Sequence, residues 1–212
     1  MKTQLLTSLA ILSMLSVGRA TLFIQGTTDQ GTSGTVAHQT IYDGSPGYLT
    51  VNSMDLTSAG LGSSLSSLAV TLNISGGMNN GLYGYLVAPN GTMVILMNQP
   101  GYGVDGFGAM GGGMNITLQD GSGTHGSIQN ETSGSTLGGS YNVAGSLSGF
   151  DGGNPNGMWT LYFSDTITGG GNATLHGWSL DITAVPEPVT LALVVFLVML
   201  LALAGLRWAW RT

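Results

Sequence analysis

The chain contains no cysteine and only four lysine or arginine residues in 212 positions. Without cysteine no disulfide can form, so packing and hydrogen bonds must hold the fold. The basic residues are Lys2, Arg19, Arg207 and Arg211, all near the chain ends, while nine of the ten acidic residues lie within residues 21–184. Proteins bind a phosphate backbone mainly through Lys and Arg. The central stretch therefore excludes a nucleic-acid partner.

The first twenty residues contain a basic, an apolar and a small-residue segment in that order. Lys2 precedes an apolar core from Leu5 to Val17, and Gly18-Arg19-Ala20 places small residues at both key positions of a cleavage site. This arrangement is typical of a secretory signal peptide. We expect residues 1–20 to be removed and the rest of the chain to be exported.

A long uncharged run lies near the C-terminus. Residues 189–206 carry no charge, and as a helix they would reach about 27 Å, close to the thickness of the hydrocarbon core of a bilayer. Arg207 and Arg211 follow, and because basic residues resist translocation they should stay in the cytoplasm. The sequence thus predicts one transmembrane helix that first anchors the exported part in the inner (cytoplasmic) membrane.

The end of the chain also carries a sorting motif. Pro186-Glu187-Pro188, the apolar run and the basic tail together resemble the PEP-CTERM signal of bacterial envelope proteins. In that family an exosortase, a membrane cysteine protease, recognises the motif and processes the protein for release or surface attachment. The resemblance covers residues 185–212 and implies an exosortase partner and a final location at the cell surface or outside the cell. An anchor that is never cleaved is the alternative.

Residues 21–184 are rich in glycine, yet the segments between the glycines alternate between apolar and polar positions. In Leu68–Ser75 the apolar residues occupy every second position, and Trp159–Ser164 repeats this with larger groups. Such alternation predicts strands with one buried face. We expect weaker strands at 22–25, 48–53, 82–88, 93–97 and 114–119.

A third strong strand contains an irregularity. Trp178, Leu180 and Ile182 alternate, but Leu175 is out of phase with them across Gly177, which predicts a β-bulge. Outside the two ends no window keeps a helical period over three turns. The sequence therefore predicts an all-β fold, an antiparallel sandwich or jelly roll.

Two groups of these strands resemble a known family. The segment around Leu82–Thr92, the segment Phe150–Asp165 and the closing block Leu175–Ile182 are similar to the P domain (P/Homo B domain) of proprotein convertases. The resemblance covers residues 68–182 and implies a galactose-binding-like jelly roll. In that family the domain follows a subtilisin-like catalytic domain and stabilises it.

These observations predict a non-catalytic module of the cell surface or extracellular matrix. The alternatives are a carbohydrate-binding module, which would contact an envelope polysaccharide, and an accessory P domain that acts with another exported protein, a separate subtilisin-like serine protease. We expect no enzymatic activity, because Gly31-Thr32-Ser33 departs from the subtilisin nucleophile pattern. His38, His125 and His176 are then surface loop residues rather than catalytic bases.

Calcium is the one metal that the sequence favours. Asp151, Asn154, Asn156 and Asp165 offer oxygen ligands in turn-forming sequence, in an acidic domain without cations. The alternative is that these residues make the turns through their own backbone hydrogen bonds. Zinc is not expected with no cysteine and three scattered histidines, and no other cofactor is expected.

Two further patterns have structural interpretations. Trp159 and Trp178 could form a sugar platform, but their apolar neighbours in phase predict core positions. Two matches to G-x-G-x-x-G between Gly101 and Gly111 are not followed by a helical pattern and predict a flexible loop rather than a dinucleotide site.

Overall fold

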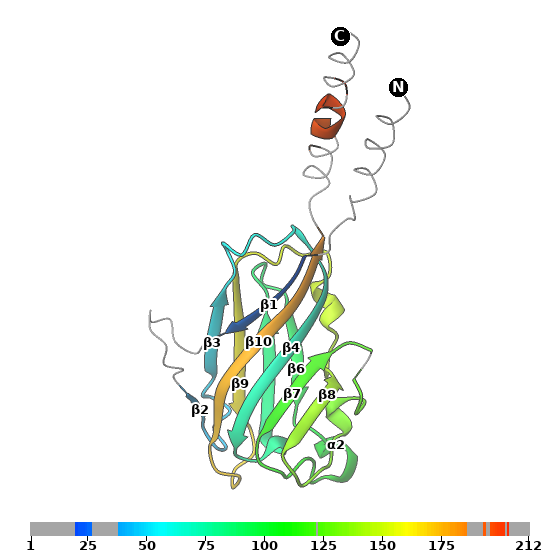
Figure 1. Ribbon diagram of the computed structural model, residues 1–212. Helices are drawn as coiled ribbons and strands as arrows, with labels where there is room; N and C mark the ends of the chain where they lie inside the picture. The colour runs from blue at the N-terminus through cyan, green and yellow to red at the C-terminus, as the bar shows by residue number, and fades with distance from the viewer. Residues whose placement is uncertain are drawn as a thin grey trace.

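The computed structural model describes residues 20–26, 38–121, 123–185, 193, 196–201 and 203. Within these residues the chain forms two β-sheets that pack face to face around one apolar core (Figure 1). The strands are β1 (Ala20–Gly26), β2 (Gln39–Ile41), β3 (Thr50–Asp55), β4 (Ser64–Gly76), β5 (Leu82–Val87), β6 (Met93–Asn98), β7 (Met114–Gln119), β8 (Leu137–Asn142), β9 (Met158–Asp165) and β10 (Ala173–Val185). The short helices are η2 (Asn79–Gly81), α2 (Tyr102–Asp105), η3 (Ile128–Asn130) and η4 (Leu147–Phe150). The predicted all-β sandwich is confirmed.

One sheet has the strand order β1-β10-β4-β7-β8, with β2 also paired to β10, and the other has the order β3-β9-β5-β6. The pairs are antiparallel except β7 and β8, which run parallel, with Met114 opposite Leu137. The prediction of a wholly antiparallel fold was wrong at this pair. Residues 120–136 return the chain to the level at which β7 begins, as a parallel connection requires.

The core consists of the alternating residues that the sequence indicated. Leu68, Val70, Leu72 and Ile74 of β4 are each at most 6% exposed. Trp159 and Trp178 are 1% and 2% exposed, so the interpretation of these two rings as core residues is confirmed.

The two tryptophan rings also satisfy their polar groups inside the core. The indole N–H of Trp178 in β10 donates to Asn52 Oδ1 in β3 at 2.6 Å, so this bond joins the two sheets. The indole N–H of Trp159 donates to the carbonyl of Pro155 at 2.8 Å.

The bulge predicted in β10 is present. The register between β10 and β4 shifts between Leu175 and Gly177, which makes His176 the extra residue. Because of this insertion Leu175 and Trp178 are both buried, although three positions separate them.

Strands β2 and β8 were missed by the sequence reasoning. β2 has only three residues, too few to show a period. β8 contains Gly138 and Gly139, which have no side chain to reveal an alternation.

The sandwich begins and ends at the same place. Ala20 in β1 lies opposite Ala184 in β10, and the start of β1 and the end of β10 meet at one end of the sandwich (Figure 1). Residues 1–19 of the predicted signal peptide and the Pro186-Glu187-Pro188 motif lie outside the described residues.

Most of the predicted membrane helix, 189–206, is also outside the described part of the chain. Residues 193, 196–201 and 203 are described and are helical. Among the residues that the structure describes, no helix is long and apolar enough to cross a membrane.

Candidate functional site

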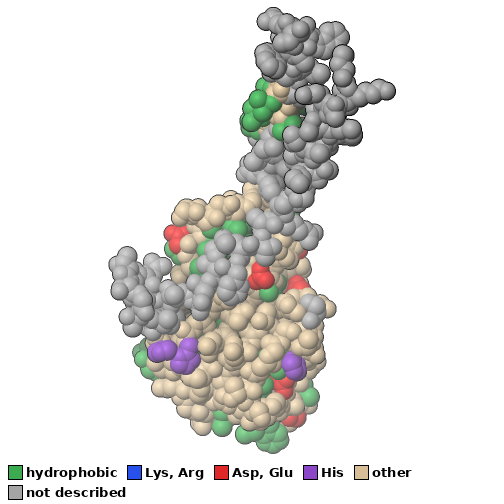
Figure 2. All heavy atoms as spheres, viewed as in Figure 1, with side chains coloured by type: hydrophobic (Ala, Val, Ile, Leu, Met, Phe, Trp, Pro, Cys, Tyr) green, Lys and Arg blue, Asp and Glu red, His purple; other side chains and the backbone are tan. Residues whose placement is uncertain are grey.

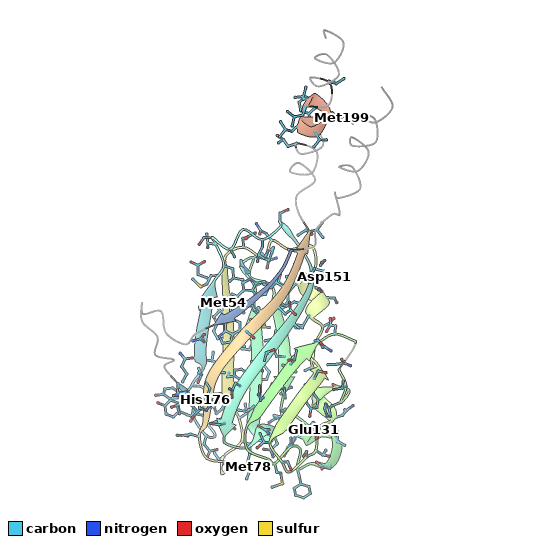
Figure 3. The ribbon with its side chains drawn as sticks, viewed as in Figure 1. Met54, Met78, Glu131, Asp151, His176 and Met199 are labelled. Atoms are coloured by element: carbon cyan, nitrogen blue, oxygen red, sulfur yellow. The ribbon has the colours of Figure 1, made fainter. Side chains whose placement is uncertain are left out.

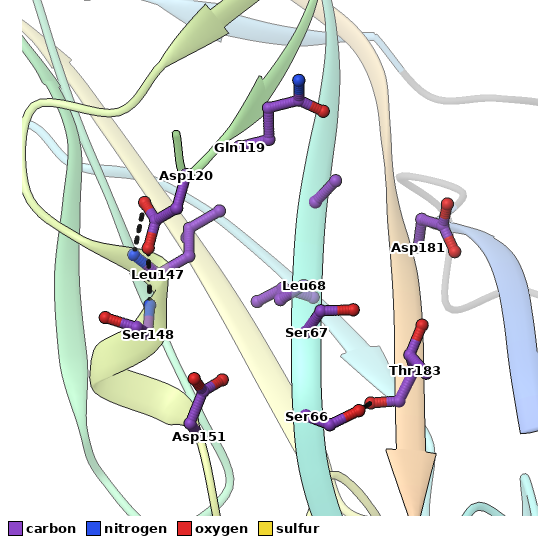
Figure 4. Close-up of a pocket in the computed structure, with 11 residues that line it drawn as sticks. Ser66, Ser67, Leu68, Gln119, Asp120, Leu147, Ser148, Asp151, Asp181 and Thr183 are labelled. Carbon is purple, nitrogen blue, oxygen red and sulfur yellow. Dashed lines mark hydrogen bonds between the residues drawn. The ribbon is translucent and has the colours of Figure 1, made fainter. Parts of the chain in front are cut away.

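A hollow of about 400 Å³ opens beside β4, at the end of the sandwich where β1 begins and β10 ends (Figure 4). β4 extends beyond β7 here, because β7 pairs only with Val70–Ile74. Further along, the backbone of Leu65 accepts from Gly152 N–H and donates to Gly153 O, each at 2.8 Å. The intervening residues 66–69 face the hollow. Its lining consists of Ser66, Ser67, Leu68, Ala69, Gln119, Asp120, Leu147, Ser148, Asp151, Asp181 and Thr183.

Asp120 holds the wall of the hollow opposite β4. It accepts hydrogen bonds from Leu147 N–H at 3.0 Å, from Ser148 N–H at 2.8 Å and from the Ser146 hydroxyl at 2.7 Å, so it fixes the start of η4 (Figure 4). Burial raises the pKa of Asp120, but the three hydrogen bonds outweigh it and leave the pKa below its ordinary value. Asp120 is therefore an anionic structural residue at neutral pH.

The other two carboxylates that line the hollow, those of Asp151 and Asp181, are available to bind a ligand. Among the described residues, the side chains of Asp151 and Asp181 accept no hydrogen bond. Burial, followed by the negative charge of Asp120, raises the pKa of Asp151. The four Lys and Arg of the chain all fall outside the described residues. The hollow therefore repels anions and offers acceptors to a ligand rich in hydroxyl groups.

The structure does not bring the four predicted calcium ligands together. Asp151 is in the wall of the hollow, whereas Asn154 Oδ1 accepts from the backbone N–H and the side chain of Asn156, both at 2.9 Å. Asn156 in turn bonds both backbone polar groups of Leu61, at 3.1 Å each. These two asparagines thus make the turn, as the alternative interpretation proposed.

Asp165 lies at the opposite end of β9, about 25 Å along an eight-residue strand. One ion cannot bind it together with the other three, so the four-ligand calcium set does not hold as a single site. Asp165 is 1% exposed; its Oδ1 accepts from Ile167 N–H at 3.0 Å, and its Oδ2 has no partner. Burial chiefly raises the pKa of Asp165, and the charge of Asp43 adds to it. A Cβ at Gly81 would lie 2.1 Å from Oδ1, so only glycine fits beside this carboxylate.

The half-buried tyrosine side chains on the outer face of the β3-β9-β5-β6 sheet were not identified from the sequence. Tyr85 and Tyr162 stack at 4.6 Å with 9° between their ring planes, and Tyr83 lies 5.8 Å from Tyr85. They occupy the positions of β5 and β9 that alternate with the buried ones, and this alternation could have identified them in the sequence. Since the two stacked rings cover a face of each other, they stabilise the sheet as a cross-strand pair rather than form a flat platform.

Residues Gly101–Gly113 form a well-braced loop at the end of the sandwich opposite the hollow, instead of the flexible loop that we expected (Figure 1). Asp105 Oδ1 accepts from Phe107 N–H at 2.8 Å and from Gly108 N–H at 2.7 Å, bonds that lower the pKa of Asp105. Apolar side chains gather at this end (Figure 2). The exposed ones in the loop are Tyr102, Val104, Phe107 and Met110, 45–67% exposed.

Of the residues considered for catalysis, Ser33 lies outside the described part of the chain. His125 stacks on Tyr141 at 4.9 Å. His38 and His176 contact each other, and His176 also contacts Ser75, which the sequence reasoning did not single out.

No protein-family model and no curated protein matches the chain. Two solved structures align with it: a complex of the Aeromonas sobria serine protease and a chaperone, and the serine protease of Aeromonas sobria alone. The first covers 84% of this chain at 13% identity with a TM-score of 0.44, and the second covers 83% at 14% identity with a TM-score of 0.42. The chain spans 29% of the length of each matched chain. Similarity at this level says nothing of activity.

Proposed function

We propose that the chain is a non-catalytic, exported binding module that is sorted to the cell surface through residues 185–212. The arrangement of the chain ends supports this most directly. Ala20 and Ala184 lie opposite each other, so a leader before β1 and a sorting segment after β10 both leave from one end of the sandwich (Figure 1). This geometry is compatible with a domain that is held at a membrane by one segment and processed at both ends.

We further propose that the sandwich is a P-domain-like jelly roll. The segments that carry the resemblance occupy central places in the two sheets, as β5, β9 and β10. Their apolar motif residues are buried, as a shared core would require: Trp159, Leu161, Leu175, Trp178, Leu180 and Ile182.

Processing of the C-terminus tests the sorting proposal. Replacing Glu187 with alanine should block recognition by an exosortase, so that the protein accumulates in the inner membrane with residues 189–212 still attached. Cell fractionation and mass spectrometry of both mature ends check this result. The wild-type chain should begin at Thr21 and end near Pro188.

Thr190→Ala is the matched control, because it changes a polar residue two positions beyond the motif and should be processed normally. Full-length wild-type chain in the cytosol, with both ends intact, would contradict the export proposal. Wild-type protein that stays anchored with an intact C-terminus would contradict exosortase processing only and would support the uncleaved anchor.

For the ligand, we propose a neutral envelope polysaccharide bound in the hollow. The hollow has the volume of a small-ligand site and combines hydroxyls, carboxylates and the apolar Leu68 and Leu147. The carboxylates of Asp151 and Asp181 accept bonds from sugar hydroxyls and disfavour polyanionic sugars.

Ser67→Tyr places an aromatic ring in the hollow and should lower the affinity for the polysaccharide by roughly tenfold or more. Retention of the full-length protein on immobilised neutral envelope polysaccharide measures this change, with a polyuronate as the anionic comparison. Val51→Tyr is the control, because it adds the same ring at an exposed strand position on the other sheet. Equal retention of both variants and the wild type would exclude the hollow.

The braced loop favours a second candidate, an accessory role on another exported protein. Its apolar side chains project from the end of the sandwich opposite the hollow, where a protein partner would bury them. Phe107→Ser should then remove co-purification with a secreted peptidase while leaving polysaccharide retention unchanged. Loss of polysaccharide retention in this variant would show that the two surfaces are not separate.

A further inference from the structure

His38 and His176 approach each other through equivalent ring nitrogens. Nδ1 of His176 lies 2.7 Å from Nδ1 of His38, and Nε2 of His176 lies 2.6 Å from Ser75 Oγ. The two rings meet edge to face, with centroids 4.4 Å apart and 78° between their planes. The three residues come from three separate segments: the position just before β2, the end of β4 and the bulge of β10.

The fold explains the position of His176 but not its identity. The bulge exists because Leu175 and Trp178 must both be buried, and any inserted residue satisfies that need. The inserted side chain lies at the surface of the sandwich, against the edge where β2 begins (Figure 3). Neither the bulge nor the core requires a histidine at this point, where it faces another histidine.

In the hydrogen bond between Ser75 Oγ and Nε2 of His176, either atom can donate, depending on the tautomer of His176. In the tautomer in which Nε2 donates to Ser75 Oγ, the Nδ1 lone pair of His176 is directed toward His38 and accepts from its Nδ1–H, and a metal ion can take the place of that proton. Metal-ligating histidines have this arrangement, in which the second ring nitrogen donates to an oxygen acceptor and fixes the ring. We propose that His38 and His176 bind a divalent transition-metal ion of the zinc, copper or nickel class, with Ser75 as the residue that positions His176.

The geometry and the charge of the domain suit this class of ion. Two imidazole nitrogens around a tetrahedral zinc ion lie about 3.3 Å apart, so a small rotation of the exposed His38 ring, which moves its nitrogen by under about 1 Å, accommodates the ion. Imidazole ligands favour zinc, copper and nickel over calcium. No Lys or Arg lies among the described residues to repel the ion.

The site is open rather than closed. The described residues hold no cluster of three or more His, Cys, Asp or Glu. His38 and His176 therefore supply two ligands, and the other coordination positions are left to water or to a group of a second molecule. Such a site connects the module to a partner through the ion, which a closed structural zinc site cannot do.

Calorimetric titration of the full-length chain with ZnCl₂ tests the proposal, using a tag without histidine and a mild detergent. We expect one saturable site per chain. His38→Ala and His176→Ala should each abolish measurable binding, and Ser75→Ala should weaken it about tenfold. His125→Ala is the control and should bind like the wild type, because His125 stacks on Tyr141 away from the pair.

A second measurement needs no substitution. In NMR spectra of the wild-type chain, sub-stoichiometric Ni²⁺ should broaden the ring signals of two of the three histidines and leave the third sharp. Absence of saturable binding, equal broadening of all three rings, or unchanged binding in both histidine variants would overturn the proposal. Ester hydrolysis that depends on Ser75, without metal binding, would assign the three residues to catalysis and would also overturn it.

Discussion

Trp178→Ala is expected to lower the free energy of unfolding by about 3–5 kcal/mol. Trp178 is 2% exposed and fills space between the two sheets, so its truncation leaves a cavity that the surrounding strands cannot close completely. The change also removes the donor for Asn52 Oδ1, and Asn52 is only 6% exposed. Urea unfolding of the full-length chain in mild detergent, followed by far-UV circular dichroism, measures the loss.

Trp178→Phe separates the two contributions. Phenylalanine keeps most of the volume but cannot donate, so this variant should lose about 1–3 kcal/mol through the unpaired Asn52. If Trp178→Ala unfolded at the same urea concentration as the wild type, the ring would not belong to the core, and the packing of β10 against β3 would be wrong.

Asp165→Asn is expected to have the opposite effect on stability. At neutral pH it should raise the free energy of unfolding by on the order of 1–2 kcal/mol. The carboxylate of Asp165 is buried with Oδ2 unpartnered, and its charge is not compensated by any Lys or Arg among the described residues. Asparagine has nearly the same shape, keeps an oxygen for Ile167 N–H and removes the charge.

The gain should depend on pH in a defined direction. Because burial raises the pKa of Asp165 in the folded state, the unfolded chain loses this proton first as the pH rises, and the wild type loses stability between the unfolded and the folded pKa. The advantage of Asp165→Asn should therefore be near zero in acid and reach its full size above the folded pKa.

Urea midpoints across the acid range measure this trend, with the exposed Asp181→Asn as a control that should show little change. Destabilisation of Asp165→Asn at neutral pH would mean that Oδ2 has a partner, and rescue of the difference by calcium would identify that partner as a cation.

The strands with large alternating side chains were predictable, and the reason is their two-residue period. β4, β9 and β10 each bury a continuous row of apolar groups, and even the bulge at His176 was visible as a phase error between Leu175 and Trp178. The parallel pairing of β7 with β8 was not predictable. β8 itself could not be recognised, because Gly138 and Gly139 have no side chains that could show a two-residue period. The local sequence pattern shows which face of a strand is buried, but it does not show which other strand lies next to it.

The candidate sites were less predictable because they join distant segments. His38 and His176 are 138 positions apart, and only the pairing of β2 with β10 brings them together. The hollow exists because β4 is longer than its neighbour β7. The sequence of either strand alone does not show that the two strands are neighbours. Conversely, Asn154 and Asn156 looked like ligands because turn formation and calcium binding use the same side-chain oxygens.

The position of β10 has a mechanical consequence. This strand is paired to β4 along nearly its whole length and to β1 and β2 on its other edge. If the module is tethered through Val185 and a load pulls on the opposite end, the force runs parallel to β10 and strains many inter-strand hydrogen bonds at once. Strands loaded in shear must break these bonds simultaneously, whereas strands pulled sideways separate by breaking single bonds in succession. A tether at Val185 would therefore attach where the sandwich best resists being torn open.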